Sequence, residues 1–203
     1  MSFYAEKIFP RLNDLATQPF AHLRARALEK ATGTVLEIGA GTGLNFAHYP
    51  KAVTKVVALE PSSGMLERAK ARAEAAPVPV ELKLGEAENL PFPDASFDTV
   101  AATLVFCSVN DPEKAAREVL RVLKPGGQWL LLEHIRSDRP DTLRWQQRWN
   151  PLWRRIFLGC TLDRDIPAVL RTAGFDASGA TEFNIEGPGI VSHMLGGSAL
   201  KPA

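Results

Sequence analysis

The amino-acid sequence predicts an α/β fold built on a doubly wound, mostly parallel sheet of seven strands. Short apolar runs of strand length alternate with helical patterns along the chain, which is the arrangement that βα units produce. No repeat or low-complexity tract interrupts the alternation. A length of 203 residues fits one domain with a sizeable core, so we expect a single domain over residues 1–203.

Local patterns justify the individual elements in chain order. An amphipathic helical cap comes first, within residues 1–30. The helix expected from Ser62 to Ala76 opens with serines that can cap its N-terminus, and Asp111 can cap a helix through Arg121. Strands are expected at 34–38, 55–60, 79–84, 97–104 and 128–134, followed by a helix near 163–172 and weak strands around 178–186 and 189–195.

Residues 141–172 are predicted to form a helical lid rich in aromatic residues and arginine. Trp145, Trp149 and Trp153 recur every four residues, so a continuous helix would stack them on one face. The pair Asn150-Pro151 interrupts the pattern, because asparagine is a good N-cap and proline suits the first helical position. We therefore expect one helix to end near Trp149 and another to begin at Pro151.

The most informative stretch is TVLEIGAGTG, residues 34–43, in which an apolar strand enters a glycine-rich turn. A dinucleotide site would show G-x-G-x-x-G, whereas Gly39, Gly41 and Gly43 follow Glu37 here. Glycine lets the backbone take positive φ and approach a ligand closely. A pyrophosphate beside Glu37 would be repelled and a cationic centre attracted, while amides at Gly41 and Gly43 can meet a carboxylate. A tight turn without a ligand is the alternative.

Three later segments also include or follow the carboxyl end of a predicted strand, which is where open α/β sheets bind ligands. In VVALEPSSGML, residues 56–66, Glu60 ends the second strand about 20 residues after the turn and can accept hydrogen bonds from ribose hydroxyls. Pro61 and Met65 would give an adenine an apolar wall. The other segments are GEAENLPF, residues 85–92, and DASFDTVAATLVFCSV, residues 94–109.

The E-x-G-x-G-x-G motif at residues 37–43 resembles that of the class I S-adenosylmethionine methyltransferases. The resemblance covers residues 34–134, which include an LxPGG segment at residues 123–127. It implies their Rossmann-like fold, with residues 34–134 as the cofactor-binding core, and S-adenosylmethionine as cofactor. It also implies that Glu86 receives the adenine amino group while the Ala87 amide meets the ring nitrogen. The expected cofactor-binding residues are Glu37, Gly39, Ala40, Gly41, Gly43, Asn45, Glu60, Pro61, Met65, Glu86, Ala87, Thr103 and Leu104.

A narrower resemblance, to the methyltransferase-like thiol methyltransferases, rests on TLVFCSV (103–109), LLEHI (131–135) and WQQRWNPLWRRIFLGCTLDR (145–164). It implies methyl transfer to a small, fairly apolar acceptor, preferably a thiol. An oxygen or amine acceptor on a lipid, quinone or other small molecule is the alternative. An NAD-dependent oxidoreductase and a non-catalytic cofactor-binding protein are alternatives from different classes. The family's animal members carry a hydrophobic N-terminal anchor, which the start MSFYAEKIFPRL lacks, so membrane residence is not implied.

His134 is the candidate catalytic base, because it ends the fifth strand on the cofactor side and a histidine pKa suits proton transfer. Hydrogen bonding in the pocket wall is the alternative role. Strand alternation points Glu133 to the opposite face. Cys107 and Cys160 are expected to be buried as small hydrophobic residues, and no residue is assigned to a metal. The expected acceptor-binding residues are Tyr4, Phe106, Trp145 and Trp149.

Composition restricts partners and location. A net charge of +1 provides no basic surface for nucleic acid. Two cysteines cannot form a disulfide framework, and the start of the chain is too charged for a signal peptide, so we expect a cytoplasmic protein. No apolar run approaches the roughly 20 residues that span a bilayer, which leaves peripheral membrane contact, through the lid for example.

Overall fold

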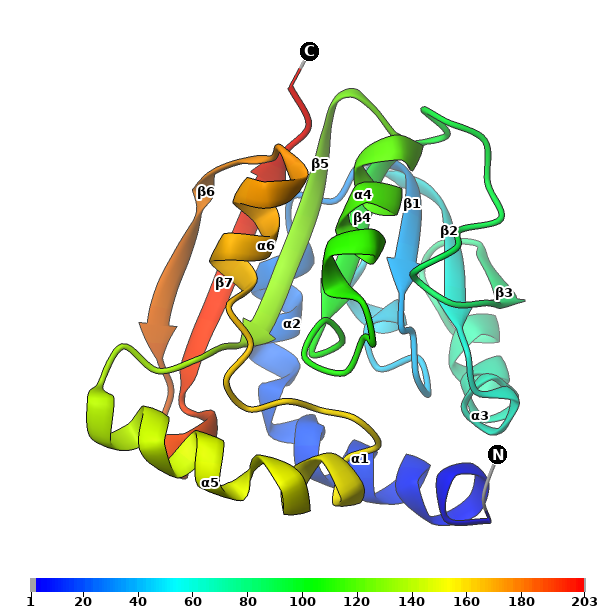
Figure 1. Ribbon diagram of the computed structural model, residues 1–203. Helices are drawn as coiled ribbons and strands as arrows, with labels where there is room; N and C mark the ends of the chain where they lie inside the picture. The colour runs from blue at the N-terminus through cyan, green and yellow to red at the C-terminus, as the bar shows by residue number, and fades with distance from the viewer. Residues whose placement is uncertain (1–2, 203) are drawn as a thin grey trace.

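The computed structural model describes residues 3–202, and within them a seven-stranded sheet lies between two layers of helices (Figure 1). The strand order is β3-β2-β1-β4-β5-β7-β6. Strands β1 to β5 are parallel, and β7 runs antiparallel to β5 and β6. The doubly wound, mostly parallel sheet predicted from the sequence is therefore confirmed.

The strands and helices have the following bounds. The strands are β1 (Gly33–Ile38), β2 (Val53–Glu60), β3 (Val80–Leu84), β4 (Phe97–Thr103), β5 (Leu123–His134), β6 (Asp176–Asn184) and β7 (His193–Leu200). The α-helices are α1 (Phe9–Thr17), α2 (Ala21–Leu28), α3 (Ser63–Glu74), α4 (Pro112–Val122), α5 (Pro140–Ile156) and α6 (Ile166–Ala173). Short helical turns are η1 (Tyr4–Ile8), η2 (Gln18–Phe20), η3 (Phe46–His48) and η4 (Gly189–Val191).

Both predicted helix caps form. Two strands, β5 and β7, depart from their expected bounds by four residues or more, and the others by one or two residues. The Met65 amide donates to Ser62 Oγ at 3.2 Å, and the Lys114 amide donates to Asp111 Oδ1 at 2.9 Å. Strand β5 starts at Leu123 instead of residue 128, because the intervening turn is paired with the end of the chain through Lys201. The last strand is β7 over 193–200, since the expected start at 189 forms the turn η4.

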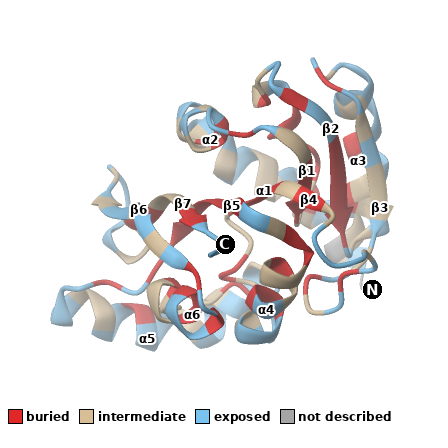
Figure 2. Ribbon diagram, turned by 90° about the horizontal axis from the view of Figure 1, so that it is seen from above, coloured by how far each residue is buried: buried red, intermediate tan, exposed pale blue. Residues whose placement is uncertain are grey.

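The helices pack on the sheet as two layers, each with its own core. Figure 2 shows α4 and α6 over one face and α2 and α3 over the other. Leu36 and Leu131 belong to the first core, whereas Val35 and Leu130 belong to the second, as the alternation of side chains along a strand requires. Both faces of the central parallel strands are thus buried, which leaves their carboxyl ends as the place for a ligand.

Helix α5 and the N-terminal segment of η1 and α1 lie across those carboxyl ends (Figure 1). The predicted break in α5 is wrong, because the helix is continuous with Pro151 inside it. Asn150 does not cap a helix. Its Oδ1 accepts from the Leu162 amide at 2.7 Å, so the side chain fixes the segment that follows α5. Such tertiary contacts compensate for the helical hydrogen bond that proline removes.

Candidate active site

The glycine turn after β1 (residues 39–43) is tightly packed at two of its glycines and open at the third. Gly39, Gly41 and Gly43 have φ of +63°, +57° and +84°, a region that other residues rarely adopt. A Cβ on Gly39 would lie 2.5 Å from Val105, and one on Gly43 would lie 2.5 Å from the Phe46 ring. A Cβ on Gly41 would have only the Gly39 carbonyl oxygen near it, at 4.0 Å. Gly39 and Gly43 therefore serve close packing, whereas Gly41 faces free space.

Glu60, at the end of β2, is hydrogen-bonded to the same turn. The Gly41 amide donates to its Oε2 at 2.9 Å, and the Ser62 amide donates to its Oε1 at 3.0 Å. Burial raises the pKa of Glu60, and the two amide hydrogen bonds act in the opposite direction. Each carboxylate oxygen can accept more than one hydrogen bond, so this acid keeps capacity for hydroxyl donors from a ligand.

A buried polar network lies next to the turn, and Glu37 is one of its hydrogen-bond acceptors. The Glu37 carboxylate accepts from Asn45 Nδ2 at 3.0 Å and from the Tyr49 hydroxyl at 2.7 Å. Burial raises the pKa of Glu37 to about 7. Arg24, a buried cation on α2, donates to Asn45 Oδ1 at 2.9 Å and to Thr103 Oγ1 at 2.6 Å. The network joins α2 and the ends of β1 and β4 beneath the turn, and supplies positive charge close to it.

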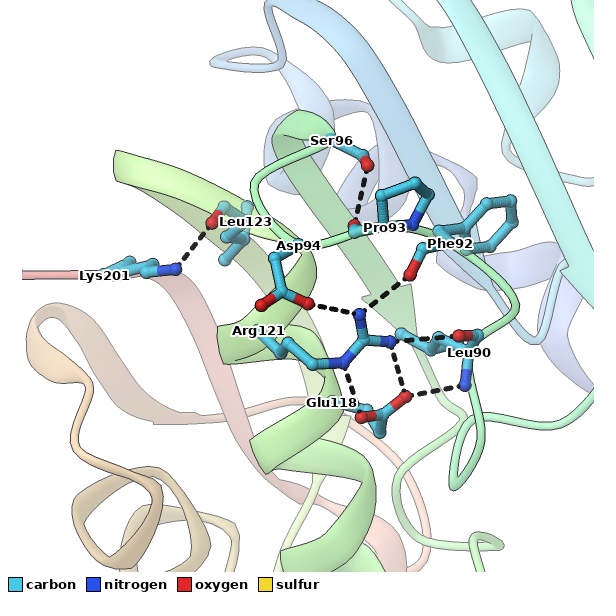
Figure 3. A network of polar contacts seen from close by, with 9 residues as sticks. All are labelled: Leu90, Phe92, Pro93, Asp94, Ser96, Glu118, Arg121, Leu123 and Lys201. Atoms are coloured by element: carbon cyan, nitrogen blue, oxygen red, sulfur yellow. Dashed lines mark hydrogen bonds and ion pairs between the residues drawn. The ribbon is translucent and has the colours of Figure 1, made fainter.

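The segment that follows β3 is held by Arg121 near the end of α4 (Figure 3). Its guanidinium donates to the Leu90 and Phe92 carbonyls at 3.0 and 2.8 Å, and it pairs with Glu118 and Asp94, both at 2.8 Å. Glu118 in turn accepts from the Leu90 amide at 2.8 Å. This network fixes the end of the segment that carries Glu86, which is exposed, and Ala87, which is buried.

The N-terminal segment is held over the site by contacts to the turn and to α5. Arg72 of α3 donates to the Thr42 carbonyl at 2.8 Å and pairs with Asp14 of α1 at 3.0 Å. The Thr42 hydroxyl also bonds Asp14. The Tyr4 hydroxyl donates to the Ile156 carbonyl at the end of α5, at 2.6 Å. The N-terminal segment and α5 therefore form one cover above the strand ends.

His134, Cys107 and Cys160 converge at the ends of β5, β4 and α5. His134 Nε2 lies 3.1 Å from Cys160 Sγ, and the two sulfur atoms lie 3.6 Å apart. Burial lowers the pKa of His134, but the hydrogen bond with Cys160 and the charges of Cys160 and Glu133 outweigh it, so the net change is upward. Within residues 3–202, His134 Nδ1 is buried without a hydrogen-bond partner.

Glu133, the residue before His134, holds the loop that follows β4. Its carboxylate accepts from the Val105 amide at 2.8 Å and the Phe106 amide at 3.0 Å. Burial raises the pKa of Glu133 to about 7. The carboxylate thereby fixes the loop after β4, including Leu104, which has a positive φ of 59°.

Comparison with known proteins identifies the family. Residues 36–131 match the model of a methyltransferase domain. Mouse thiol S-methyltransferase TMT1B is 31% identical over 179 residues, which cover 86% of this chain and 73% of that protein. The chain belongs to the thiol S-methyltransferase family of TMT1A and TMT1B. It is therefore a member of the class I S-adenosylmethionine-dependent methyltransferases, as the sequence motifs predicted.

Two further comparisons define the extent of this relationship. Human thiol S-methyltransferase TMT1A is 35% identical over 160 residues, covering 77% of this chain but only 65% of that relative. A putative methyltransferase from Bacillus halodurans has the same fold, with a TM-score of 0.72 and 22% identity, covering 91% of this chain and all of that structure. The family and the fold are thus established over most of this chain.

Several residues expected to bind the cofactor line one cavity in this family member. Its walls are formed by residues 39–42, Leu44, Asn45, Thr103 and Leu104, together with Asn13, Thr17 and Arg24 from the N-terminal helices. Gly41 has an open side and its amide donates to the Glu60 carboxylate, so these two residues lie side by side, as the predicted cofactor site needs. The assignment of Glu60 to the ribose stays a prediction. Pro61 is exposed and Met65 is buried at the start of α3.

Three of the expected acceptor-binding residues occupy other environments. Phe106 is fully buried in the core, with its ring centroid 4.5 Å from that of Trp129, because Glu133 draws the loop inward. Trp145 and Trp149 are 53% and 45% exposed on α5. The lid tryptophan that faces inward is Trp153, whose indole N–H lies 3.3 Å from Cys160 Sγ. The contact with Cys160, in the segment that follows α5, fixes this orientation.

Sequence reasoning missed Arg24, Tyr49 and the Asp14–Arg72 pair. Arg24 acts on Thr103, which is 79 residues away, and Arg72 on Asp14, which is 58 residues away. No local motif marks such partners. Both cysteines are buried, as expected. The Cys160 sulfur is not in apolar surroundings alone, however, because it contacts His134, Trp153 and Cys107.

Proposed function

We propose that this chain transfers the methyl group of S-adenosylmethionine to the thiol of a small, fairly apolar molecule. The observation that carries the proposal lies at the carboxyl ends of β1 and β2. There the Gly41 amide donates to the Glu60 carboxylate, and the side of Gly41 where a Cβ would be is open. Membership of the TMT1 family supports the thiol. When bound, the cofactor supplies a methyl group on a sulfonium centre, so the protein has to align the acceptor and exclude water.

The cost of ionising the acceptor favours a thiol. At pH 7, a thiol with a pKa near 8.5 costs about 2 kcal/mol to ionise, whereas a phenol near 10 costs roughly 4 kcal/mol. A thiol therefore needs less help from the protein. We propose His134 as the base that provides this help, through Nδ1, because Nε2 is engaged by Cys160. A role in orienting the acceptor is the alternative.

Tyr4 and α5 form the proposed entrance for the acceptor, because they cover the strand ends together. Trp145, Trp149, Leu152 and Ile156 are exposed on α5 at spacings of four, three and four residues, which place them on one face of the helix. Arginines at 144, 148, 154 and 155 accompany this stripe. We propose that the stripe makes peripheral contact with a membrane surface, from which an apolar acceptor could enter.

The described part of the chain contains no helix with the length and apolar character needed to cross a membrane. Peripheral contact is tested by sedimentation with vesicles of neutral and of anionic lipid. The double variant Trp145→Ser/Trp149→Ser should reduce binding, and Leu84→Ser, an exposed apolar residue on β3, serves as the control. Equal binding of both variants and the unchanged protein would reject this surface.

The acceptor class is tested by mass detection of methylated products. Purified protein is incubated with S-adenosylmethionine and matched alkyl thiols, phenols, amines and a quinol of similar size. Turnover of the thiols well above the others supports the proposal. Turnover confined to the oxygen or amine acceptors overturns the thiol, and no product despite cofactor binding indicates a non-catalytic binder. Calorimetry with S-adenosylmethionine and with NAD distinguishes the cofactor classes.

A further inference from the structure

Two cysteines and a histidine from distant parts of the chain meet in one buried cluster. Cys107 follows β4, His134 ends β5 and Cys160 follows α5. Their donor atoms all lie within 4.8 Å of one another, and all three residues are buried. The Sγ atoms of Cys107 and Cys160 are 3.6 Å apart, and Cys160 Sγ is 3.1 Å from His134 Nε2. No disulfide joins the cysteines.

Polar groups from three parts of the chain surround the Cys160 sulfur. It lies 3.6 Å from Cys107 Sγ, 3.1 Å from His134 Nε2 and 3.3 Å from the Trp153 indole nitrogen. Thiolate and imidazole are the preferred protein ligands of zinc and related thiophilic ions. The cluster therefore has the chemical character of a soft-metal site.

Two of the three donor separations match those of a metal centre, and all three donor atoms lie within 4.8 Å of one another. With zinc–sulfur bonds of about 2.3 Å and zinc–nitrogen bonds of about 2.0 Å, tetrahedral angles place two sulfurs about 3.8 Å apart and a sulfur and a nitrogen about 3.5 Å apart. The observed separations, 3.6 Å and 3.1 Å, are within a few tenths of an ångström of these values. We propose that Cys107, His134 and Cys160 bind one zinc ion or a similar thiophilic divalent cation.

Charge and proton balance are consistent with this assignment. Binding of one divalent cation to two thiols and a neutral histidine releases two protons, one from each thiol, and the two thiolates balance the charge of the ion. Three protein ligands leave a fourth position for water. The Trp153 indole N–H, 3.3 Å from Cys160 Sγ, would continue to donate to the bound thiolate, as outer hydrogen bonds do in metal sites.

The metal site does not rest on the proposed methyl transfer, and it changes what His134 can do. A cation on Nε2 requires the ring proton to be on Nδ1, so the metal-bound histidine cannot accept a proton from an acceptor. The activity measurements that examine His134 as a base are therefore made on metal-free protein. Metal binding itself is measured without turnover, so the two proposals can fail separately.

The test uses cobalt as a spectroscopic probe for zinc. Reduced protein is stripped with a chelator and titrated with Co²⁺. The expected result is one ion per chain, with a thiolate-to-cobalt charge-transfer band, tetrahedral visible bands, and displacement of both by Zn²⁺. Because Cys107 and Cys160 are the chain's only cysteines, this band in the unchanged protein identifies them even if a cysteine variant fails to fold.

Variants then assign the ligands. Cys107→Ser, Cys160→Ser and His134→Ala should each weaken zinc binding by at least roughly 100-fold, more than the 10- to 100-fold typical of outer residues. His22→Gln alters an exposed histidine and should bind as the unchanged protein does. Native mass spectrometry gives the stoichiometry and circular dichroism checks folding. Absence of the charge-transfer band in folded, reduced protein, or full affinity in a folded cysteine variant, would overturn the site.

Discussion

Replacing Glu60 with alanine should weaken binding of S-adenosylmethionine and of its product, S-adenosylhomocysteine. The carboxylate accepts from the Gly41 amide of the glycine turn at 2.9 Å and from the Ser62 amide at the start of α3 at 3.0 Å, and is expected to accept further hydrogen bonds from ribose. Hydrogen bonds to a charged group contribute about 1.5–3 kcal/mol. A loss of this size corresponds to a roughly 10- to 150-fold increase in Kd.

Calorimetric titration with S-adenosylhomocysteine measures this change, and thermal unfolding shows whether the turn remains folded. Glu60→Gln keeps one oxygen for one of the two amides, so its affinity should fall between those of the alanine variant and the unchanged protein. Glu81→Ala is the matched control, because Glu81 is exposed on the adjacent strand and pairs with Lys55. It should leave the affinity unaltered.

The raised pKa of Glu60 adds a pH signature. Burial disfavours the charged carboxylate, so protonation on acidification starts at a higher pH than for an ordinary glutamate. Protonation removes acceptor capacity, and cofactor affinity should therefore fall with decreasing pH in the unchanged protein and much less in Glu60→Gln. Unchanged affinity of a folded Glu60→Ala variant would refute the assignment of Glu60 to the ribose.

Three further predictions concern other positions. Gly41→Val should abolish cofactor binding, because a β-branched residue is strained at a φ of +57°; retained binding by calorimetry with normal stability would reject the role of the turn. In metal-free protein, His134→Asn should lower kcat by about 10²–10⁴ for an alkyl thiol but little for an acidic aromatic thiol, and equal losses of kcat/KM would reject the base. Hydrogen bonding by Arg121 lowers the pKa of Glu118, so Glu118→Gln should cost about 1 kcal/mol of unfolding free energy at pH 7. That difference should shrink as the pH falls below about 4.5 through the lower folded pKa, whereas a pH-independent difference in chemical denaturation would contradict it.

The fold could be predicted because its signals are local. Apolar runs mark each parallel strand, and Ser62 and Asp111 mark helix starts within one turn of the residues that they cap. The prediction failed where distant contacts override local preference. Asn150 and Pro151 have the sequence of a helix start, but Asn150 bonds to the Leu162 amide and α5 continues.

The same distinction separates the two parts of the candidate site. The glycine turn could be found because its residues are contiguous and because the conformation itself requires glycine. The three tryptophans were predicted in two helical segments and lie instead in the single helix α5. Their spacing alone does not determine which face turns inward. Trp153 faces Cys160, whereas Trp145 and Trp149 remain about half exposed. Tertiary contacts made outside the repeating pattern decide this orientation.

The cysteine–histidine cluster is the part that no sequence pattern could reveal. Cys107 and His134 are 27 positions apart and Cys160 follows 26 positions later, without the short ligand spacing typical of zinc motifs. They meet because the parallel strands β4 and β5 end at the same edge of the sheet and the segment after α5 returns beneath it. The topology that creates the cofactor edge thus also assembles the metal-ligand cluster. Loss of cobalt binding without loss of cofactor affinity in Cys160→Ser would demonstrate two separable sites on that edge.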